Sequence, residues 1–226
     1  MTRTARAPLS RERILDAAVA IADAEGLAAV TMRGVAQQLD CEAMSLYYHV
    51  KDKAQLVTGL VEVIIDEVIA TTLDNPPGGP QAGDWRDVVR ARCLGARHVM
   101  LRHPWAPPLV ANADQVPPNT YRVFEALVAT MIEAGFSYDL AHRAIHAIGS
   151  MILGFTQELF DPNVDTDELS DDELAALAGA FPHLGAIAAS QPHDAAQSLS
   201  VCDTQAEFEF TLGLVLDGLD ALRPAV

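Results

Sequence analysis

Apolar residues recur three and four positions apart along nearly all of this 226-residue chain, and the alternating pattern of a β-strand is absent. A helix places residues with that spacing on one face, so the pattern predicts an all-α protein. Half of the residues are apolar, which is enough for a substantial core and excludes a mostly disordered chain.

Capping residues divide the first 72 residues into four expected helices. Ser10 and Thr31 are good N-caps, because a side-chain oxygen can accept a hydrogen bond from the free N–H groups of a first helical turn. Gly26 suits the end of the first helix. Asp52 begins the fourth helix, with Gln55 three residues later in a capping-box arrangement. The helices are expected at residues 10–26, 31–39, 43–49 and 52–72.

A stretch rich in proline and glycine at residues 75–80 interrupts the helical pattern and marks a loop. Beyond it, helices are expected at residues 84–102, 119–134, 138–160 and 204–222, with short pieces in the proline-rich stretch that precedes residue 119. Residues 161–203 are acidic and polar, with one short helix expected at Ser170, where Glu173 completes a capping box.

Charge distinguishes two expected domains, a head at residues 8–68 and a body at residues 80–224, which are joined by the helix at about 52–72. Residues 1–57 carry 7 Lys+Arg and 7 Asp+Glu, whereas residues 58–226 carry 8 and 24, so the net charge of −16 belongs to the second part. Affinity for DNA needs positive charge near phosphates, which the whole surface does not supply. A neutral head with arginines and lysines can still bind DNA while the acidic body orients the molecule.

Several other classes of protein are disfavoured by the sequence. The first residues lack the apolar segment of a secretory signal, and no apolar run is long enough to span a membrane, so we expect a cytoplasmic protein. Cys41, Cys93 and Cys202 lie too far apart for a disulfide framework or a zinc knuckle. No phosphate-binding loop or nucleophile motif is present, so we expect neither an enzyme nor a cofactor.

Two histidines one helical turn apart deserve separate consideration as metal ligands. His142 and His146, with Asp139 one turn earlier, have a spacing that can hold zinc. No HExxH motif surrounds them, and two histidines on a helix more often lie on a solvated or packed face. We therefore expect no metal site.

Two short helices joined by a tight break, after a longer supporting helix, form the helix-turn-helix pattern. The second helix of such a pair enters the major groove of DNA, which has room for one helix. In this chain that helix is the one expected at residues 43–49, with Leu46 as its anchor in the core. Ala43, Met44 and Tyr47 share another face, from which they can touch thymine methyl groups, base edges or phosphates.

Residues 14–18, 26–27, 31–39 and 45–53 carry motifs that occur in register. Together they resemble the TetR family of one-component repressors. Gly135-Phe136-Ser137, Gly149 and Leu153-Gly154 more weakly resemble its tetracycline-repressor subgroup. The resemblance implies a three-helix DNA-binding head and a larger helical body for ligand binding and dimerisation.

The resemblance also extends the set of expected DNA contacts. Thr31 begins the second helix, whose free N–H groups suit a phosphate, and Lys53 stands at the start of the fourth. The expected contacts are Thr31, Arg33, Ala43, Met44, Ser45, Tyr47, Tyr48, His49 and Lys53.

Three departures from the family pattern change these expectations. Asp40 stands where the family usually has glycine, and Asp can adopt the left-handed conformation of that turn. Ala43 and Met44 replace polar base-reading residues of the tetracycline-binding members, so a different operator is expected. The metal-binding histidine of those members falls near Val110, and a single matching acid, Glu158, does not make a metal site. Tetracycline is therefore not the expected ligand.

Aromatic residues and methionines occur at helical spacing in the body, where such residues are usually core. In the family the same helices also line an effector cavity. The candidate effector contacts are Trp105, Tyr121, Phe124, Met151 and Phe155, with Asn112, His146 and Gln157 as polar partners. Because most of these side chains are apolar, we expect a small, largely apolar effector.

Glycines in the two last long helices suit a close contact between helices, although glycine lowers helix stability. One short recognition helix reads few base pairs, so two heads on a palindromic operator would supply specificity. We expect a two-fold homodimer with a four-helix interface. Its candidate residues are Gly149, Gly154, Phe208, Leu212, Val215 and Leu219.

These observations lead to one principal hypothesis, a dimeric repressor that binds double-stranded DNA and is released by a small effector. The alternative is an accessory binding protein with a degenerate head that acts through protein partners. The intact caps and cations of the head favour the repressor.

Overall fold

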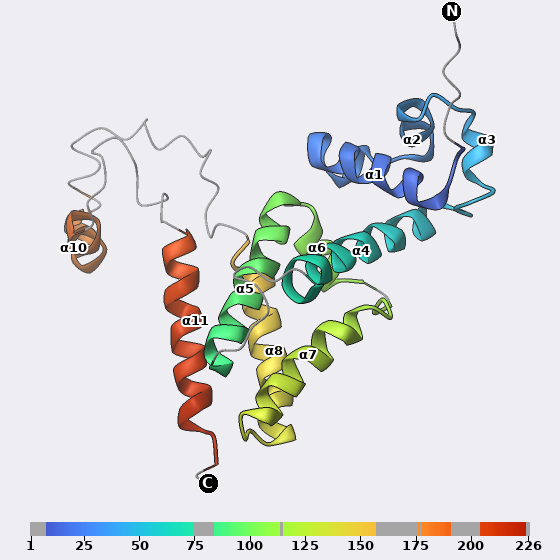
Figure 1. The fold of residues 1–226 in the computed structure, drawn as a ribbon. Coiled ribbons are helices and arrows are strands. Elements are labelled where there is room, and N and C mark those ends of the chain that lie inside the picture. The colour runs from blue at the N-terminus through green and yellow to red at the C-terminus, as the bar shows by residue number, and fades with distance from the viewer. Residues whose placement is uncertain are drawn as a thin grey trace, which may run out of the picture. The chain divides into compact units, whose positions relative to one another are not determined.

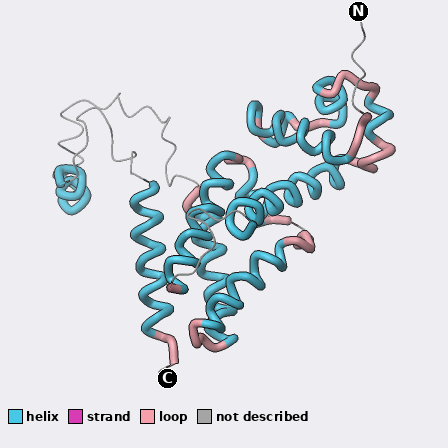
Figure 2. Tube along the Cα trace, in the orientation of Figure 1, coloured by secondary structure: helices cyan, strands magenta, loops and turns pink. Residues whose placement is uncertain are grey.

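The computed structural model describes residues 8–74, 84–113, 115–156, 176, 178–190 and 204–224, and within these ranges every regular element is a helix (Figures 1 and 2). The expected all-α fold is therefore confirmed. The chain divides into two units, residues 1–156 with 214–226 and residues 157–213. None of the helices in the described ranges is long and apolar enough to cross a bilayer.

The head begins with the helices and caps expected from the sequence. Its elements are α1 (Arg11–Glu25), a 3₁₀ turn (Leu27–Ala29), α2 (Met32–Gln38) and α3 (Ala43–Leu46). The Ser10 hydroxyl accepts a hydrogen bond from the Arg13 N–H at 3.2 Å. The Thr31 hydroxyl accepts one from the Gly34 N–H at 3.0 Å. Gly26 ends α1 with a φ of 82°, a conformation that favours glycine.

The recognition helix α3 is shorter than the sequence predicts, because residues 47–49 form a turn. The N–H groups of His49 and Val50 both donate to the Leu46 carbonyl at 2.9 Å. Val50 is buried, so the chain turns back to the core where the helical pattern alone would have continued. The prediction of a helix to His49 was wrong for this reason.

Helix α4 (Lys53–Ile69) connects the head to the body, as Figure 1 shows. It continues as a π-helical turn (Ala70–Asp74). Asp52 caps it by accepting from the Gln55 N–H at 2.8 Å. The Gln55 side chain accepts from the Lys51 N–H at 2.7 Å, one residue earlier than in a standard capping box. The expected start of this helix is confirmed.

Two faces of α4 are buried in different apolar clusters. Leu56, Leu60 and Ile64 belong to a core that also contains Ile14 of α1 and Leu46 of α3. On another face, Val61, Ile65 and Ile69 pack against residues of α6 and α7, including Leu109 and Val123. A displacement of α4 would therefore disturb both the head and the body.

The body packs four helices around this connection, α5 (Trp85–Arg102), α6 (Ala106–Ala111), α7 (Thr120–Glu133) and α8 (Tyr138–Gly154). The predicted start of α8 at Tyr138 is confirmed, but the helix ends at Gly154, so the prediction that it continues was wrong for Phe155 and Thr156. The Phe155 carbonyl accepts a hydrogen bond from the almost fully buried Arg97 guanidinium at 3.0 Å, at the point where the helix ends. Residues 157–160 lie outside the described ranges.

The C-terminal elements are α10 (Pro182–Ser190) and α11 (Thr204–Ala221). The last helix was expected and is confirmed, whereas α10 was not predicted. The short helix predicted at Ser170 and Glu173 lies outside the described residues. In the first unit, Arg86 of α5 forms ion pairs with Asp217 and Asp220 of α11 at 2.5 and 3.0 Å.

Candidate nucleic-acid interface

Helix α3 and the turn after it present large side chains to solvent. Leu46 is fully buried, whereas Met44 is 71% exposed, Tyr47 44% and Tyr48 89%. His49 is also exposed, and Ala43 and Ser45 are half-buried. A contiguous exposed patch of this kind in a folded protein typically marks a surface that contacts a partner.

The helix starts in the head supply exposed polar and cationic groups. Thr31 is the exposed cap of α2, and Arg33 lies exposed in its first turn. Lys53 is exposed as the first residue of α4. Within the described residues, neither Arg33 nor Lys53 forms an ion pair, so both are available to a phosphate.

The turn between α2 and α3 adopts the conformation expected from the sequence. Asp40 has a φ of 49°, the left-handed region in which an aspartate replaces glycine at a small cost. The Cys41 N–H then donates to the Ala36 carbonyl at 2.9 Å. Cys41 itself is a half-buried free thiol.

A polar cluster joins the head to the body. His103, which is only 7% exposed, follows α5 and has its Nδ1 at 2.7 Å from Asp23 Oδ1 of α1. Its Nε2 lies 3.0 Å from Glu67 Oε2 of α4. The Trp105 indole N–H donates to the same Asp23 oxygen at 2.6 Å, and Arg102 pairs with Glu67. The cluster, which we call the junction cluster, therefore ties α1, α4 and the end of α5 together.

Sequence reasoning missed the junction cluster. The His103-Pro104 pair indicated only the end of a helix, and its two carboxylate partners lie 80 and 36 residues away along the chain. No local spacing could have identified them. Trp105 was predicted as an effector contact, but its N–H is bonded to Asp23 and its side chain is buried in this junction.

The other effector candidates lie in varied surroundings. Tyr121 is 62% exposed and Met151 is buried, while Phe124 and Phe155 are half-buried. His146 is exposed, and the Asn112 amide donates to the Pro108 carbonyl at 2.7 Å. Gln157 lies outside the described residues. The composition of an effector pocket therefore stays a prediction.

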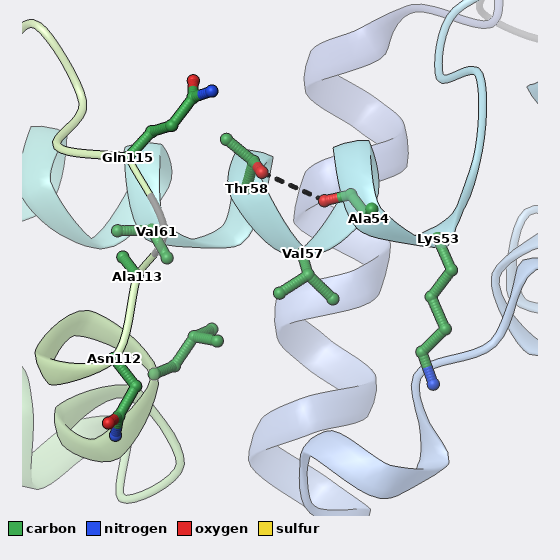
Figure 3. A pocket seen from close by; sticks show the side chains of 9 residues that line it. Lys53, Ala54, Val57, Thr58, Val61, Asn112, Ala113 and Gln115 are labelled. Atoms are coloured by element: carbon green, nitrogen blue, oxygen red, sulfur yellow. Dashed lines mark hydrogen bonds between the residues drawn. The ribbon is translucent and has the colours of Figure 1, made fainter.

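A groove of about 440 Å³ lies between α4 and the α6 region (Figure 3). Its lining residues are Lys53, Ala54, Val57, Thr58 and Val61 of α4, Leu109 and Asn112 at and just after α6, and then Ala113 and Gln115. Of the effector candidates, Asn112 lines this groove. The sequence did not indicate it, because its two walls are separated by about 50 residues.

The predicted dimer residues fall into two groups. Gly149 and Gly154 of α8 have open space around them, since a Cβ at either position would meet no other atom within 4 Å. In contrast, Phe208, Leu212 and Leu219 of α11 are already buried within the single chain, and Val215 is half-buried. The large exposed apolar side chains of this region are Phe210 and Leu214 of α11 and Leu222, which directly follows it.

The two histidines of α8 contact each other. The His142 and His146 rings meet edge to face, with centroids 4.8 Å apart. Asp139 instead pairs with Arg143 at 2.9 Å. In the described part of the chain, no three His, Cys, Asp or Glu side chains gather as a metal site would require.

Comparison with protein families covers almost the whole chain. Residues 14–60 match the family of bacterial regulatory proteins, tetR family. Residues 76–223 match the tetracyclin repressor-like C-terminal domain. The first match ends at residue 60 and the second begins at residue 76, so residues 61–75 lie between the two matches.

Individual relatives agree with these matches. The chain is 30% identical over 146 residues to an HTH-type transcriptional regulator of Saccharopolyspora erythraea, covering 65% of this chain and 59% of that protein. It is 28% identical to the HTH-type transcriptional repressor DrrR1 of Streptomyces coeruleorubidus, over 97% of this chain and 82% of the relative. The Streptomyces coelicolor TetR family protein ActR, solved in complex with actinorhodin, superposes with a TM-score of 0.73 at 25% identity, over 97% of this chain and 100% of that chain.

Proposed function

The chain belongs to the TetR family of transcriptional regulators, and from that premise we propose that it is a ligand-responsive repressor that binds a palindromic operator as a homodimer. Members of this family bind DNA and small molecules, and the relatives described above are regulators rather than enzymes.

The observation that carries the proposal is the two-sided character of α3. Leu46 fixes the helix in the core, while Met44 of α3 and Tyr47 and Tyr48 of the turn after it are exposed. Apolar and hydroxyl groups on such a helix can read thymine methyl groups and base edges in a major groove. Arg33 and Lys53 add sequence-independent contacts to phosphates.

The effector response requires a path from the body to the head. Helix α4 is packed on two faces, and the junction cluster binds Asp23 of α1 and Glu67 of α4 to His103. An effector that binds one arrangement of the body more tightly than another would shift the spacing of the two heads. DNA is released when the heads no longer match successive major grooves.

The dimer is assigned to the exposed face of α11 together with α8. Leu214 and Gly218 of α11 and Leu222 just after it are exposed at four-residue spacing. Gly149 and Gly154 leave room for close approach of a second helix to α8. This face replaces the predicted stripe of Phe208, Leu212 and Leu219, because those side chains are already buried.

Selection from random duplex DNA, followed by sequencing, tests the proposal at moderate salt. The wild-type protein should enrich a palindromic site. The double variant Met44→Ala, Tyr47→Ala should lose that enrichment while remaining folded by circular dichroism. The matched control is Tyr138→Ala, which removes a 74% exposed tyrosine from the body and should leave the enriched site unchanged.

Absence of enrichment by a folded, dimeric wild-type protein would contradict a sequence-reading head. The accessory-protein hypothesis would then be preferred. Enrichment of a site without two-fold symmetry would retain DNA reading but reject the dimeric arrangement on the operator.

A further inference from the structure

We propose that the groove between α4 and α6 is a small-molecule site for an anion with an apolar body. Its volume of about 440 Å³ falls within the range of ligand pockets. Figure 3 shows its residues on both walls, with Val57 and Val61 on α4 and Asn112 across from them. The groove thus offers contacts from two elements that also position the head.

The chemistry of the lining selects the ligand class. Val57, Val61 and Leu109 supply aliphatic surface, on which an apolar ring system can pack. Lys53 is the charged residue among those that line the groove in the described part of the chain, and it has no ion-pair partner there. An anionic group beside Lys53 would also benefit from the N-terminal dipole of α4.

Polar groups at the rim can orient such a ligand. The Asn112 side-chain nitrogen is bonded to the Pro108 carbonyl, which leaves its oxygen as an acceptor. The Thr58 hydroxyl is similarly bonded to the Ala54 carbonyl at 3.0 Å. Gln115 carries an exposed amide with both a donor and an acceptor.

Occupancy of the groove has a consequence that rests on the proposed DNA-binding function. Lys53 is also a proposed phosphate contact, so an anion bound beside it would compete with the operator backbone. By linkage, operator DNA would weaken ligand binding by the same factor as the ligand weakens DNA binding. The groove would therefore give a second, directly competitive control of DNA binding.

The site itself is tested without DNA, on the full-length protein labelled with ¹³C at valine and leucine methyl groups. The probes are 2-naphthoate and its neutral counterpart 2-naphthamide. We expect 2-naphthoate to shift the methyl signals of Val57, Val61 and Leu109 saturably, with an affinity about two- to fivefold higher than that of 2-naphthamide, because an exposed ion pair with Lys53 contributes modestly. Shifts at other methyl groups only, or equal affinities for the two probes, would overturn the proposal.

Three variants assign the effect to named residues. Lys53→Gln should remove the preference for 2-naphthoate and leave 2-naphthamide binding unchanged. Lys51→Gln, the matched control, removes an exposed lysine that does not line the groove and should keep the preference. Ala113→Phe should fill the groove and abolish binding of both probes. Retention of the preference by Lys53→Gln would also reject the proposed site.

A second arm adds the operator selected above. 2-Naphthoate should weaken DNA binding by the wild-type protein and have no effect on Ala113→Phe. If no operator is found, the methyl shifts still decide whether the groove is a site. If the shifts occur but DNA binding does not respond, the site stands and the competition at Lys53 is rejected.

Discussion

The head and the body of this protein share one apolar core but differ in net charge. A single apolar cluster contains Ile14 and Leu46 of the head together with Val99 and Ala106 of the body. On the outside, residues 1–57 are neutral, whereas residues 58–226 carry the whole charge of −16. The surface, and not the core, therefore separates the part that approaches DNA from the part that does not.

The difference in charge between head and body can orient the protein on DNA, even where the contacts are few. An acidic body is repelled by phosphates, so only the neutral head with its exposed cations can approach closely. In the proposed complex, the aromatic and apolar side chains of α3 and the turn after it would make the short-range contacts. If the comparison holds, changes in the core should affect stability and changes on the surface of the head should affect DNA binding.

The largest effect is expected from Leu46→Ala, which removes the buried anchor of α3. Its free energy of unfolding should fall by about 3 kcal/mol, because buried leucine truncations lose transfer energy and leave a cavity. Urea unfolding measures the change. On the same helix, Met44→Ala should alter stability by less than about 0.5 kcal/mol. Similar losses for both variants would break the distinction between the two sides of α3.

A smaller loss is expected from Asp23→Ala at the boundary of head and body. The Trp105 N–H and one His103 ring nitrogen, which belong to nearly buried side chains, would lose their shared partner. We expect a decrease of about 2 kcal/mol in the free energy of unfolding. Asp16→Ala changes an exposed acid on the same helix and should have almost no effect. Equal urea midpoints for the two variants would show that the junction cluster does not contribute to stability.

Lys53→Gln should weaken the free energy of operator binding by about 1 kcal/mol. The slope of log binding constant against log salt concentration should fall by about one phosphate contact per head. Fluorescence anisotropy at several salt concentrations measures both. Arg143→Gln removes a cation from the body and serves as the control. The charge comparison would fail if Arg143→Gln reduced the salt slope as much as Lys53→Gln did.

The smallest effect is expected from Arg86→Gln, which breaks two ion pairs with α11. Hydrogen bonds to Asp217 and Asp220 raise the pKa of the Arg86 guanidinium. The guanidinium is nevertheless accessible to solvent, and ion pairs in such a place contribute little to stability. The melting temperature should fall by less than about 2 °C by differential scanning fluorimetry. A larger fall would show that these surface pairs hold α11 in place.

Local patterns predicted most of the head. Ser10, Thr31 and Asp52 form their caps because such bonds depend on residues only three positions apart. Asp40 adopts its left-handed conformation for an equally local reason. The end of α3 was missed because it depends on the burial of Val50, which belongs to the tertiary packing.

The body was less predictable because its features depend on distant residues. Trp105 is an aromatic residue of the kind that lines ligand pockets, but its indole N–H is bonded to Asp23 of α1, a residue 82 positions away in the sequence. The apolar stripe of Phe208 and Leu212 could face either a partner or its own chain, and periodicity does not distinguish these. The groove between α4 and α6 likewise exists only once its two walls are brought together.

The cysteines make the head selectively accessible to chemical labelling. Burial in α5 raises the pKa of the Cys93 thiol to about 12, so at pH 8 only about one molecule in ten thousand carries the reactive thiolate. Cys41 is a half-buried thiol in the turn between α2 and α3. In a Cys202→Ser variant, a maleimide dye would therefore attach to Cys41 in preference to Cys93. The fluorophore would then report the approach of DNA from within the helix-turn-helix itself.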